Sequence, residues 1–356
     1  MFVPCIQELH LKNFRCFKQA DFIFDTPVVL IEGANGSGKT SLLEAIHYLC
    51  YVRSFRTHIP SDLVHFESDT FFIGATICSD TISIGSTGAR RQIKINQKSI
   101  TSYEELRAHC RVVTVTQEDI EIVKASPEKR RSFLDHALVL HNPELTKTLK
   151  QFRHVLETRN AFLVRGSSDT QEFDIWTQAL WTCSREIQNA RKTFLADLLL
   201  HARELEGYFL STHDVGFEYT LKQGDLLETY EQFCARSKTL FDRERYYRRS
   251  LFGAHLDDLE IVFNGRLART YCSRGQQKLL TLFLKLAQVA SLKSTGAPLI
   301  LLVDDFLSDF DSETLKRILK VSLSLNVQVI FTTPLSSGPE LIALNDLGLV
   351  FSKISI

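Results

Sequence analysis

The chain has 356 residues, of which 44% are apolar, enough for one large domain or two ordinary ones with a substantial core. Its 42 basic and 42 acidic residues cancel, so any nucleic-acid contact must come from local patches rather than from overall charge. The eight cysteines form no CxxC pair and the longest apolar runs are only strand-sized. We therefore expect a soluble cytoplasmic protein with reduced thiols and no membrane contact.

The N-terminal third has the pattern of a mixed α/β region. Apolar positions predict short strands near 6–11 and 22–24, a buried strand at 27–31, and a helix at about 40–49. Alternating residues predict further strands at 71–77, 81–86 and 91–95, and the turn sequence STGARR joins the last two as a hairpin.

The middle of the chain is helical, from 143 to about 212. One apolar series is interrupted by Arg159; the second has heptad spacings of three and four and comprises Phe173, Trp176, Leu180, Cys183, Ile187, Ala190 and Phe194. Two such helices joined by the polar segment RGSSD predict an antiparallel hairpin; two ordinary amphipathic core helices are the alternative. Buried strands return at 298–303 and 327–333, so a nucleotide-binding sheet is split by a helical insertion.

The segment IEGANGSGKTS follows the first buried strand and has the GxxxxGK[ST] pattern of a phosphate-binding loop. Backbone N–H groups and a helix N-terminus would surround phosphate, Lys39 would reach the β- and γ-phosphates, and Thr40 would bind Mg²⁺. The predicted ATP-binding residues here are Gly33, Ala34, Asn35, Gly36, Ser37, Gly38, Lys39, Thr40 and Ser41.

Two carboxylates follow the strand LILLV. Asp304 is the expected acidic partner of Mg²⁺, and Asp305 is the candidate for polarising the attacking water. We assign catalytic roles to Lys39, Asp304 and Asp305. The alternative is that the two aspartates are solvated carboxylates that cap a strand.

A second phosphate-binding surface is predicted at SRGQQK, which precedes a long apolar helix. Its residues Ser273, Arg274, Gly275 and Gln276 could serve the same nucleotide as the phosphate loop if two copies of the chain met head to tail. This segment resembles the signature motif of ABC ATPases.

The full set of motifs resembles the SMC/Rad50 branch of ABC ATPases and, most closely, the RecF family. The resemblance runs nearly end to end, through HLKNFR (10–15), the phosphate loop, RSFRT (53–57), SPEKRRSFLD (126–135), GAHLDDL (253–259), SRGQQK and VDDFLSDFD (303–311), where Ser308 and Asp311 match the D-loop.

The resemblance implies an ABC-type α/β ATPase head with a split sheet and an inserted, mostly helical lobe. The expected divisions are 1–125 for the N-terminal part of the ATPase lobe, 126–295 for the helical lobe with the signature, and 296–356 for the C-terminal part. It also implies a weak, DNA-stimulated ATPase of DNA repair, recombination, replication and the SOS response. An ATP-dependent homodimer would clamp duplex or gapped DNA and help to load recombinase, with RecR and RecO as partners.

Some positions depart from the family pattern. Ala254 and Leu256 replace the proline and arginine of Gly-Pro-His-Arg, so a basic contact is lost there. Gln117 stands where proline is common and is a candidate sensor of Mg²⁺ and water. No histidine follows the strand VIFTT, and Thr332 or Thr333 is the candidate substitute.

Four basic clusters could contact DNA phosphates: Arg53/Arg56, Arg90/Arg91, Lys129/Arg130/Arg131 and Arg243/Arg245/Arg248/Arg249. Each alone is more often a solvated face, and the last is diluted by Asp242 and Glu244. We favour Lys129, Arg130 and Arg131, with Arg53 and Arg56. No aromatic-interleaved single-strand platform stands out, which favours the duplex backbone.

Three other classes share some of these motifs. A chromosome-organising ATPase would need arms of hundreds of residues, a transporter subunit would associate with membranes, and a small-molecule kinase would not need SRGQQK.

Overall fold

The computed structural model describes residues 4–87, 90–166, 170–209, 214–294, 296, 298–307, 310–333 and 339–356. The chain forms two compact units. The first comprises Met1–Ile120, Glu204–Ser211 and Lys278–Ile356, and the second comprises Glu121–Arg203 and Thr212–Gln277. The helix after the signature motif thus counts largely with the first unit, whereas the sequence-based division placed it in a helical lobe ending at 295.

A five-stranded parallel sheet is the centre of the first unit. Its order is β14-β3-β13-β12-β8, and every neighbouring pair is parallel. The strands are β3 (Val28–Glu32), β8 (Arg111–Val115), β12 (Leu299–Val303), β13 (Gln328–Thr333) and β14 (Ser352–Ser355). All residues of β3, β12 and β13 are buried, as expected for parallel strands covered on both faces. The predicted split sheet is therefore confirmed.

A second, antiparallel sheet of the first unit has the order β2-β1-β4-β5-β6-β7. Its strands are β1 (Ile6–Phe14), β2 (Phe17–Ile23), β4 (Thr70–Ile77), β5 (Asp80–Thr87), β6 (Arg90–Ile95) and β7 (Lys98–Ile100). Thr87 pairs with Arg90, which confirms the predicted hairpin; its turn residues Gly88 and Ala89 lie outside the described residues.

Helix α1 (Lys39–Tyr51) joins the two sheets into one core. It follows the phosphate loop, and most of its residues are buried, including Leu42, Leu43, Ile46 and Leu49. These side chains share a hydrophobic cluster with residues of both sheets, so the core holds the start of α1 in place.

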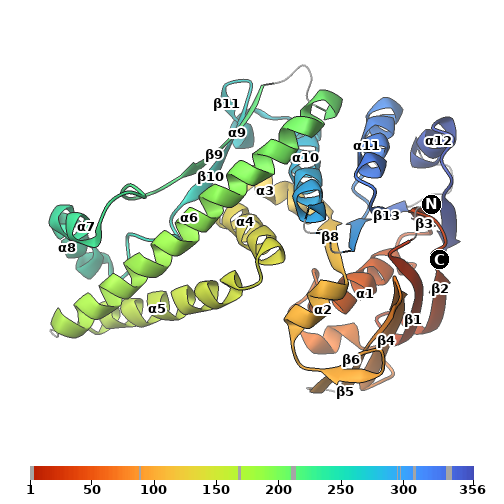
Figure 1. Ribbon diagram of the computed structural model, residues 1–356, viewed down its shortest axis with the longest axis horizontal. Coiled ribbons are helices and arrows are strands. Elements are labelled where there is room, and N and C mark those ends of the chain that lie inside the picture. Colours follow the sequence, from red (N-terminus) through yellow and green to blue (C-terminus); the bar gives the residue numbers. More distant parts are fainter. Residues whose placement is uncertain are drawn as a thin grey trace. The chain divides into compact units, whose positions relative to one another are not determined.

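The remaining helical elements of the first unit lie around these sheets (Figure 1). They are η1 (Pro60–Leu63), α2 (Tyr103–His109), η2 (Gln117–Ile120), α11 (Ser312–Ser324) and α12 (Pro339–Asp346), together with most of α10 (Arg274–Lys293).

The second unit is mainly helical. Its helices are α3 (Glu121–Lys124), α4 (Pro127–His141), α5 (Leu145–Arg165), most of α6 (Thr170–Phe209), α7 (Tyr230–Arg236), α8 (Lys238–Tyr247) and α9 (Ala268–Tyr271). A small antiparallel sheet, which the sequence pattern did not predict, has the order β11-β10-β9, with β9 (Val215–Thr220), β10 (Asp258–Phe263) and β11 (Arg266–Leu267).

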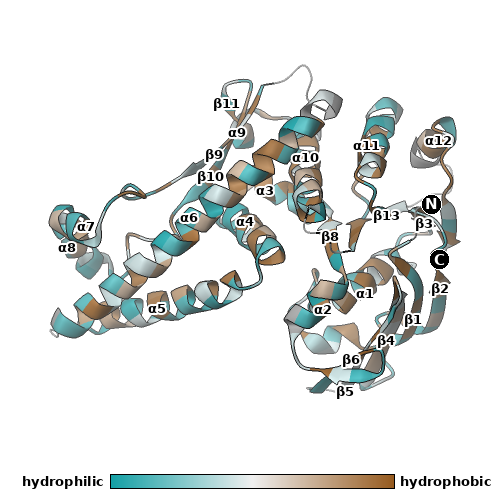
Figure 2. Ribbon diagram, in the orientation of Figure 1, coloured by the Kyte–Doolittle hydropathy of each residue, from teal (hydrophilic) through white to brown (hydrophobic). Residues whose placement is uncertain are grey.

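Helices α5 and α6 run antiparallel as the predicted hairpin (Figure 1), and apolar residues recur along both of them (Figure 2). The heptad positions Leu180, Cys183 and Ile187 are buried. They share a core with residues of α5 and also with Phe233 of α7 and Leu240 of α8. The heptad seam thus has a third layer against it and is more than a two-helix coiled coil.

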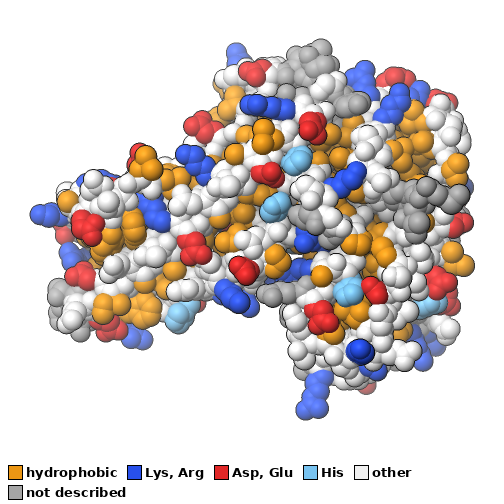
Figure 3. Space-filling model, in the orientation of Figure 1, with side chains coloured by type: hydrophobic (Ala, Val, Ile, Leu, Met, Phe, Trp, Pro, Cys, Tyr) orange, Lys and Arg blue, Asp and Glu red, His pale blue; other side chains and the backbone are white. Residues whose placement is uncertain are grey.

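The surface carries both signs of charge. On the face drawn in Figure 3, basic and acidic side chains are interspersed. Within the described ranges, no helix combines the length and apolarity needed to cross a membrane.

Candidate nucleotide-binding site

The phosphate loop connects the buried strand β3 to the start of α1. Gly36 and Gly38 have φ angles of 85° and 116°, in the region that L side chains rarely adopt. A Cβ at Gly38 would also lie 2.8 Å from Cys16 Sγ and 2.9 Å from the Phe17 ring. Glycine at 38 is therefore required both by the backbone conformation and by the close approach of the β1–β2 hairpin.

Lys39 is the first residue of α1 and is only 8% exposed. Its Nζ donates to the carbonyl oxygens of Gly33 (2.8 Å) and Ala34 (2.9 Å), so its partners are neutral groups of the loop itself. Charge-assisted bonds to phosphate oxygens are stronger than bonds to carbonyls. The ammonium is therefore in place for an anion in the loop.

Asp304 follows β12, at the same edge of the parallel sheet as the phosphate loop. Its Oδ1 accepts from Thr40 Oγ1 at 3.0 Å and from Thr332 Oγ1 at 3.0 Å. Strands β3, β13 and β12 are adjacent, so their carboxyl ends place the three residues together. Burial raises the pKa of the Asp304 carboxyl, an effect that the two threonine hydrogen bonds partly oppose.

These residues fit a magnesium nucleotide. Thr40 and Asp304 supply a hydroxyl and a carboxylate oxygen, the hard ligands that Mg²⁺ prefers. The buried Ser37 Oγ in the loop has no hydrogen-bond partner among the described residues, as expected of a group that faces phosphate. Mg²⁺ usually keeps several waters and binds substrate phosphates, so phosphate and water would complete its ligands here.

Gln117 and Asp305 contact each other beside the Asp304 carboxylate. Gln117 Nε2 donates to the backbone oxygen of Asp305, and its buried Oε1 has no partner within the described ranges. The backbone N–H of Asp305 donates to Thr332 Oγ1 at 2.8 Å, and Asp305 has a φ of 46°. Thr332 thus links the two aspartates.

A buried carboxylate on α1, which sequence reasoning missed, joins two further motifs. Glu44 is fully buried, and both its oxygens accept from Arg15 at 2.7 Å. The Ser54 hydroxyl also donates to it, and the half-exposed Arg56 lies 3.6 Å away. Arg56 also lowers the pKa of Asp304. The available signal in the sequence was the charged Glu44 within an otherwise apolar helix, since a buried carboxylate needs a basic partner.

The motifs SPEKRRSFLD and GAHLDDL meet in the second unit. Arg130 is 3% exposed and makes two hydrogen bonds to Asp258, at 2.7 and 2.9 Å. Arg131 donates to the backbone oxygen of Asp257 at 2.6 Å. Arg130 is thus committed to the fold, whereas Arg131 is half-buried and Lys129 is exposed. The buried Ala254 is also used through its backbone, which accepts from Arg191 at 2.7 Å.

The signature segment begins α10 as a reciprocal cap. Ser273 Oγ accepts from the Gln276 N–H at 3.3 Å, and Gln276 Oε1 accepts from the Ser273 N–H at 2.9 Å. Ser273, Arg274 and Gly275 are exposed. The segment is therefore ordered and accessible at the surface of its unit.

Of the predicted D-loop pair, Asp311 caps α11 and accepts from Thr314 N–H at 2.9 Å. Hydrogen bonds from Thr314 hold the pKa of the Asp311 carboxyl below its usual value. Ser308 lies outside the described residues.

The parallel sheet, the phosphate loop beside Asp304 and the exposed signature residues at the start of α10 define an ABC-type P-loop ATPase head. The chain belongs to the RecF/RecN/SMC N-terminal domain family, whose model matches residues 5–337, and within it to the RecF proteins.

Relatives of similar length support this assignment. The DNA replication and repair protein RecF of Cyanothece sp. is 30% identical over 347 residues, covering 92% of this chain and 91% of the relative. That of Streptococcus equi subsp. zooepidemicus is 30% identical over 337 residues, covering 92% and 91%.

Solved structures agree with the sequence relatives. The recombination mediator protein RecF–ATPrS of the RecFOR pathway superposes with a TM-score of 0.82 at 28% identity, covering 94% of each chain. The Smc head domain of Pyrococcus furiosus, at 15% identity and a TM-score of 0.54, covers 96% of this chain and 92% of its own, and shares the fold alone.

Proposed function

We propose that this protein is an ATP-dependent DNA-binding protein of recombinational repair and replication maintenance. ATP drives two copies together as a clamp on duplex or gapped DNA, which helps to load recombinase with RecR and RecO, and slow DNA-stimulated hydrolysis opens the clamp. The names of the relatives, a DNA replication and repair protein and a recombination mediator of the RecFOR pathway, support this assignment.

The observation that carries the proposal is the convergence of Lys39, Thr40 and Asp304. The lysine is held by neutral carbonyls and the aspartate by two hydroxyls, so both charges remain for a ligand. Mg²⁺ held by Thr40 and Asp304 would offset the phosphate charge of ATP. Asp305 serves as the base that orients water, and Gln117, bonded to its backbone, senses the occupied site.

The signature segment of one copy closes the site of the other. Ser273, Arg274, Gly275 and Gln276 lie at the N-terminal end of the long helix α10, a position suited to the γ-phosphate of a partner's nucleotide. Asp311, at the start of α11, belongs to the same dimer surface. The ATPase lobe is formed by 1–125 and 296–356, and 126–295 carries the signature.

DNA phosphates are contacted by the exposed Lys129 together with Arg53, Arg56 and Arg131. Arg130, included in the sequence-based prediction, is bound to Asp258 and supports its neighbours rather than facing solvent.

The first test is solution mass by light scattering, with and without a non-hydrolysable ATP analogue and a short duplex. We expect a monomer that becomes a DNA-bound dimer only with nucleotide. Lys39→Ala should abolish the shift, whereas Lys98→Ala, at an exposed lysine on β7, should not. A monomer under every condition would refute the clamp.

A mixing experiment tests the shared site. Lys39→Ala and Ser273→Arg should each abolish ATP hydrolysis alone. Mixed in equal amounts, they should recover part of it, because one composite site then has both intact surfaces. No recovery would mean that the signature does not act across a dimer. Vesicle association or a phosphorylated small-molecule product would instead favour a transporter subunit or a kinase.

A further inference from the structure

Four of the eight cysteines form one cluster in the first unit. Cys5, Cys50 and Cys110 are buried and Cys78 is half-buried, and all four belong to or pack against the same hydrophobic core. Cys5 Sγ lies 3.8 Å from Cys110 Sγ and 4.0 Å from Cys78 Sγ. The Cys110 thiol also interacts with that of Cys50. Four separate segments thus supply a continuous row of thiols, for which the sequence, without a CxxC pair, gives no signal.

Cys5 and Cys78 lie opposite each other at the end of the β1–β4 ladder. Ile6 pairs with Ile77, so the two cysteines are the next pair in this register, and the Cys78 N–H donates to the Cys5 carbonyl oxygen at 2.6 Å. Opposite residues of an antiparallel pair have Cβ atoms about 4.5–5.5 Å apart, and a disulfide needs about 3.5–4.5 Å. Because these ranges meet, side-chain rotation with a small backbone shift brings the two sulfurs to bonding distance.

A polar contact ties the segments that carry Cys78 and Cys110 to each other. Asp80, two residues after Cys78, accepts from Asn96 at 2.7 Å and is hydrogen-bonded to His109 Nδ1 at 2.6 Å. These hydrogen bonds hold the pKa of the Asp80 carboxyl below its usual value. Since His109 directly precedes Cys110, the contact keeps the half-buried thiol and the innermost thiols in one place.

The half-buried Cys78 is the point at which an oxidant from solvent reaches the cluster. Thiols react with hydroperoxides as thiolates, and burial, with the neighbouring Cys5 and Asp80, raises the pKa of Cys78 to about 11. Its thiolate is scarce near neutral pH, so oxidation is slow and requires sustained exposure. Once the Cys78 sulfur is oxidised, the Cys5 thiol is already in contact with it, and the second step is intramolecular.

We propose that Cys5 and Cys78 are an oxidation site, at which a hydroperoxide converts the two thiols into a disulfide that joins β1 to β4. The Cys78 thiolate attacks the peroxide; an S–O bond forms, the O–O bond breaks, and a sulfenic acid and water or an alcohol result. The Cys5 sulfur then attacks the Cys78 sulfur. An S–S bond forms, the S–O bond breaks, and the thiol proton leaves with the hydroxide as water. The two thiols lose two electrons, which the peroxide takes up.

Cys110 extends the site inward. Its sulfur attacks the Cys5 sulfur of the disulfide, which forms a Cys5–Cys110 bond and releases Cys78, to which the proton passes. The exchange moves the bond from the half-buried edge into the core, and it links β1 to the residue before β8 of the parallel sheet. The four cysteines lie outside the nucleotide-binding residues, so this oxidation does not rest on the proposed function.

The test is peptide mapping of the full chain after treatment with hydrogen peroxide, with free thiols blocked before digestion. Trypsin, which cuts after lysine and arginine, places the four cysteines on different peptides. We expect a peptide pair that links Cys5 to Cys78, and one that links Cys5 to Cys110 after longer exposure. The rate of linkage should rise about tenfold for each pH unit between about 7 and 9, as the thiolate fraction of Cys78 does.

Single variants separate the steps. Cys78→Ser should abolish the loss of the Cys5 thiol, whereas Cys234→Ser, at a half-buried cysteine of the second unit, should leave the linked peptides unchanged. Cys5→Ser should leave Cys78 as a sulfenic acid, which dimedone captures. Cys110→Ala should retain the link between Cys5 and Cys78.

Oxidation of Cys78 without a link to Cys5 or Cys110 would overturn the proposal, as would a link that forms only in urea. So would a cluster that stays reduced after the exposed Cys16 has been oxidised, because the oxidant was then active. Links only between two chains, seen as a dimer on a non-reducing gel, would also overturn it, since they indicate reaction of surface cysteines.

Discussion

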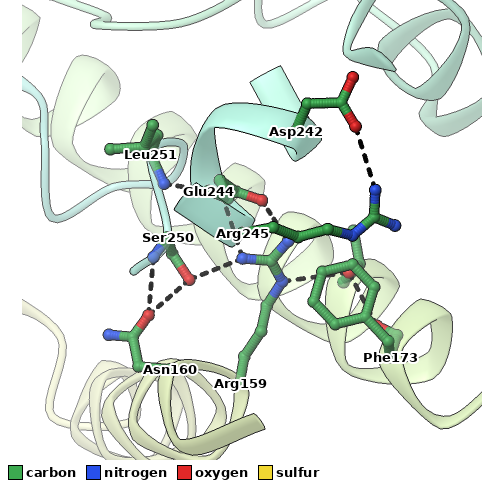
Figure 4. A network of polar contacts seen from close by, with 9 residues as sticks. Arg159, Asn160, Phe173, Asp242, Glu244, Arg245, Ser250 and Leu251 are labelled. Carbon is green, nitrogen blue, oxygen red and sulfur yellow. Dashed lines mark hydrogen bonds and ion pairs between the residues drawn. The ribbon is translucent and has the colours of Figure 1, made fainter. Parts of the chain in front are cut away.

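Buried charges in the two units have different partners. In the nucleotide-binding site the ammonium of Lys39 is held by two carbonyl oxygens. In the second unit the guanidinium of Arg159 is held by the Glu244 carboxylate (Figure 4) and lies over the rings of Phe173 and Phe252, 4.7 and 4.8 Å from the ring centroids. A buried charge with neutral partners keeps its field for a ligand, whereas one with a bidentate counterion serves the fold.

The largest expected effect on stability is at the buried ion pair of Arg159 and Glu244. Arg159→Ala should lower the free energy of unfolding by about 3–5 kcal/mol, because the Glu244 carboxylate remains buried without its counterion. Urea denaturation can follow Trp176 and Trp181, the two tryptophans of the chain, which both lie on α6. Replacing both charges, Arg159→Met with Glu244→Leu, should restore most of the stability. A loss below about 1 kcal/mol in the single variant would contradict the comparison.

Replacing the buried lysine of the nucleotide-binding site should affect ATP binding rather than the stability of the fold. Lys39→Met should weaken ATP binding by about 2–5 kcal/mol. Without nucleotide, unfolding should change by less than about 1 kcal/mol, since only two bonds to carbonyls are lost. Calorimetric titration with the ATP analogue, beside urea denaturation of the same variant, measures both. A large loss of stability without nucleotide would show that Lys39 supports the loop.

The next effect is the dependence of the stability of the second unit on acid pH. Burial lowers the pKa of His255 from 6.5 to about 4, so the unfolded chain takes up a proton first as the pH falls. The contribution of this histidine to stability is complete above pH 6.5 and is lost between pH 6.5 and 4, by about 2–3 kcal/mol. His255→Phe should flatten the stability of the second unit across this range. An unchanged pH profile would refute this assignment.

The contribution of Asp304 to stability should depend on pH with the opposite sign to that of His255, and this effect should be the smallest. Because burial raises its pKa, the charged carboxylate destabilises the fold above that pKa, and the cost disappears as the pH falls toward 3.8. Asp304→Asn keeps an oxygen for both threonines and should raise the Tm at neutral pH without nucleotide, while hydrolysis is lost. Glu313→Gln, at an exposed carboxylate, serves as the control. A lower Tm in Asp304→Asn would contradict the prediction.

The nucleotide-binding site was largely predictable because its residues lie in short, local patterns. A strand, a glycine loop and a helix start occupy consecutive residues, and Asp304 directly follows an apolar run. Of the two candidate threonines, Thr332 donates to Asp304 Oδ1 and accepts from the Asp305 N–H.

The pairs that join distant motifs were not predictable. Glu44 binds Arg15, and Arg130 binds Asp258 across more than a hundred residues. The β9–β10 pairing likewise joins segments whose short alternation gave no clear strand signal. These contacts depend on which surfaces meet after folding, which local periodicity does not encode.

The sequence contained a partial signal that the side chain of Glu244 points inward. Arg159 interrupts an apolar stripe, and Glu244 follows the buried Leu240 by four residues, on the same face of α8. Each position alone is compatible with a solvated charge. Only the packing of α8 against α5 and α6 brings the two together.

The sequence by itself determined the split parallel sheet, the phosphate loop, the helical insertion and the RecF resemblance, because each is written in local spacing or in ordered motifs. The tertiary structure decided which charges remain for ligands. Burial and counterions are properties of packed neighbours, so only the fold could place Arg130 and Glu244 inside and leave Lys39 with neutral partners.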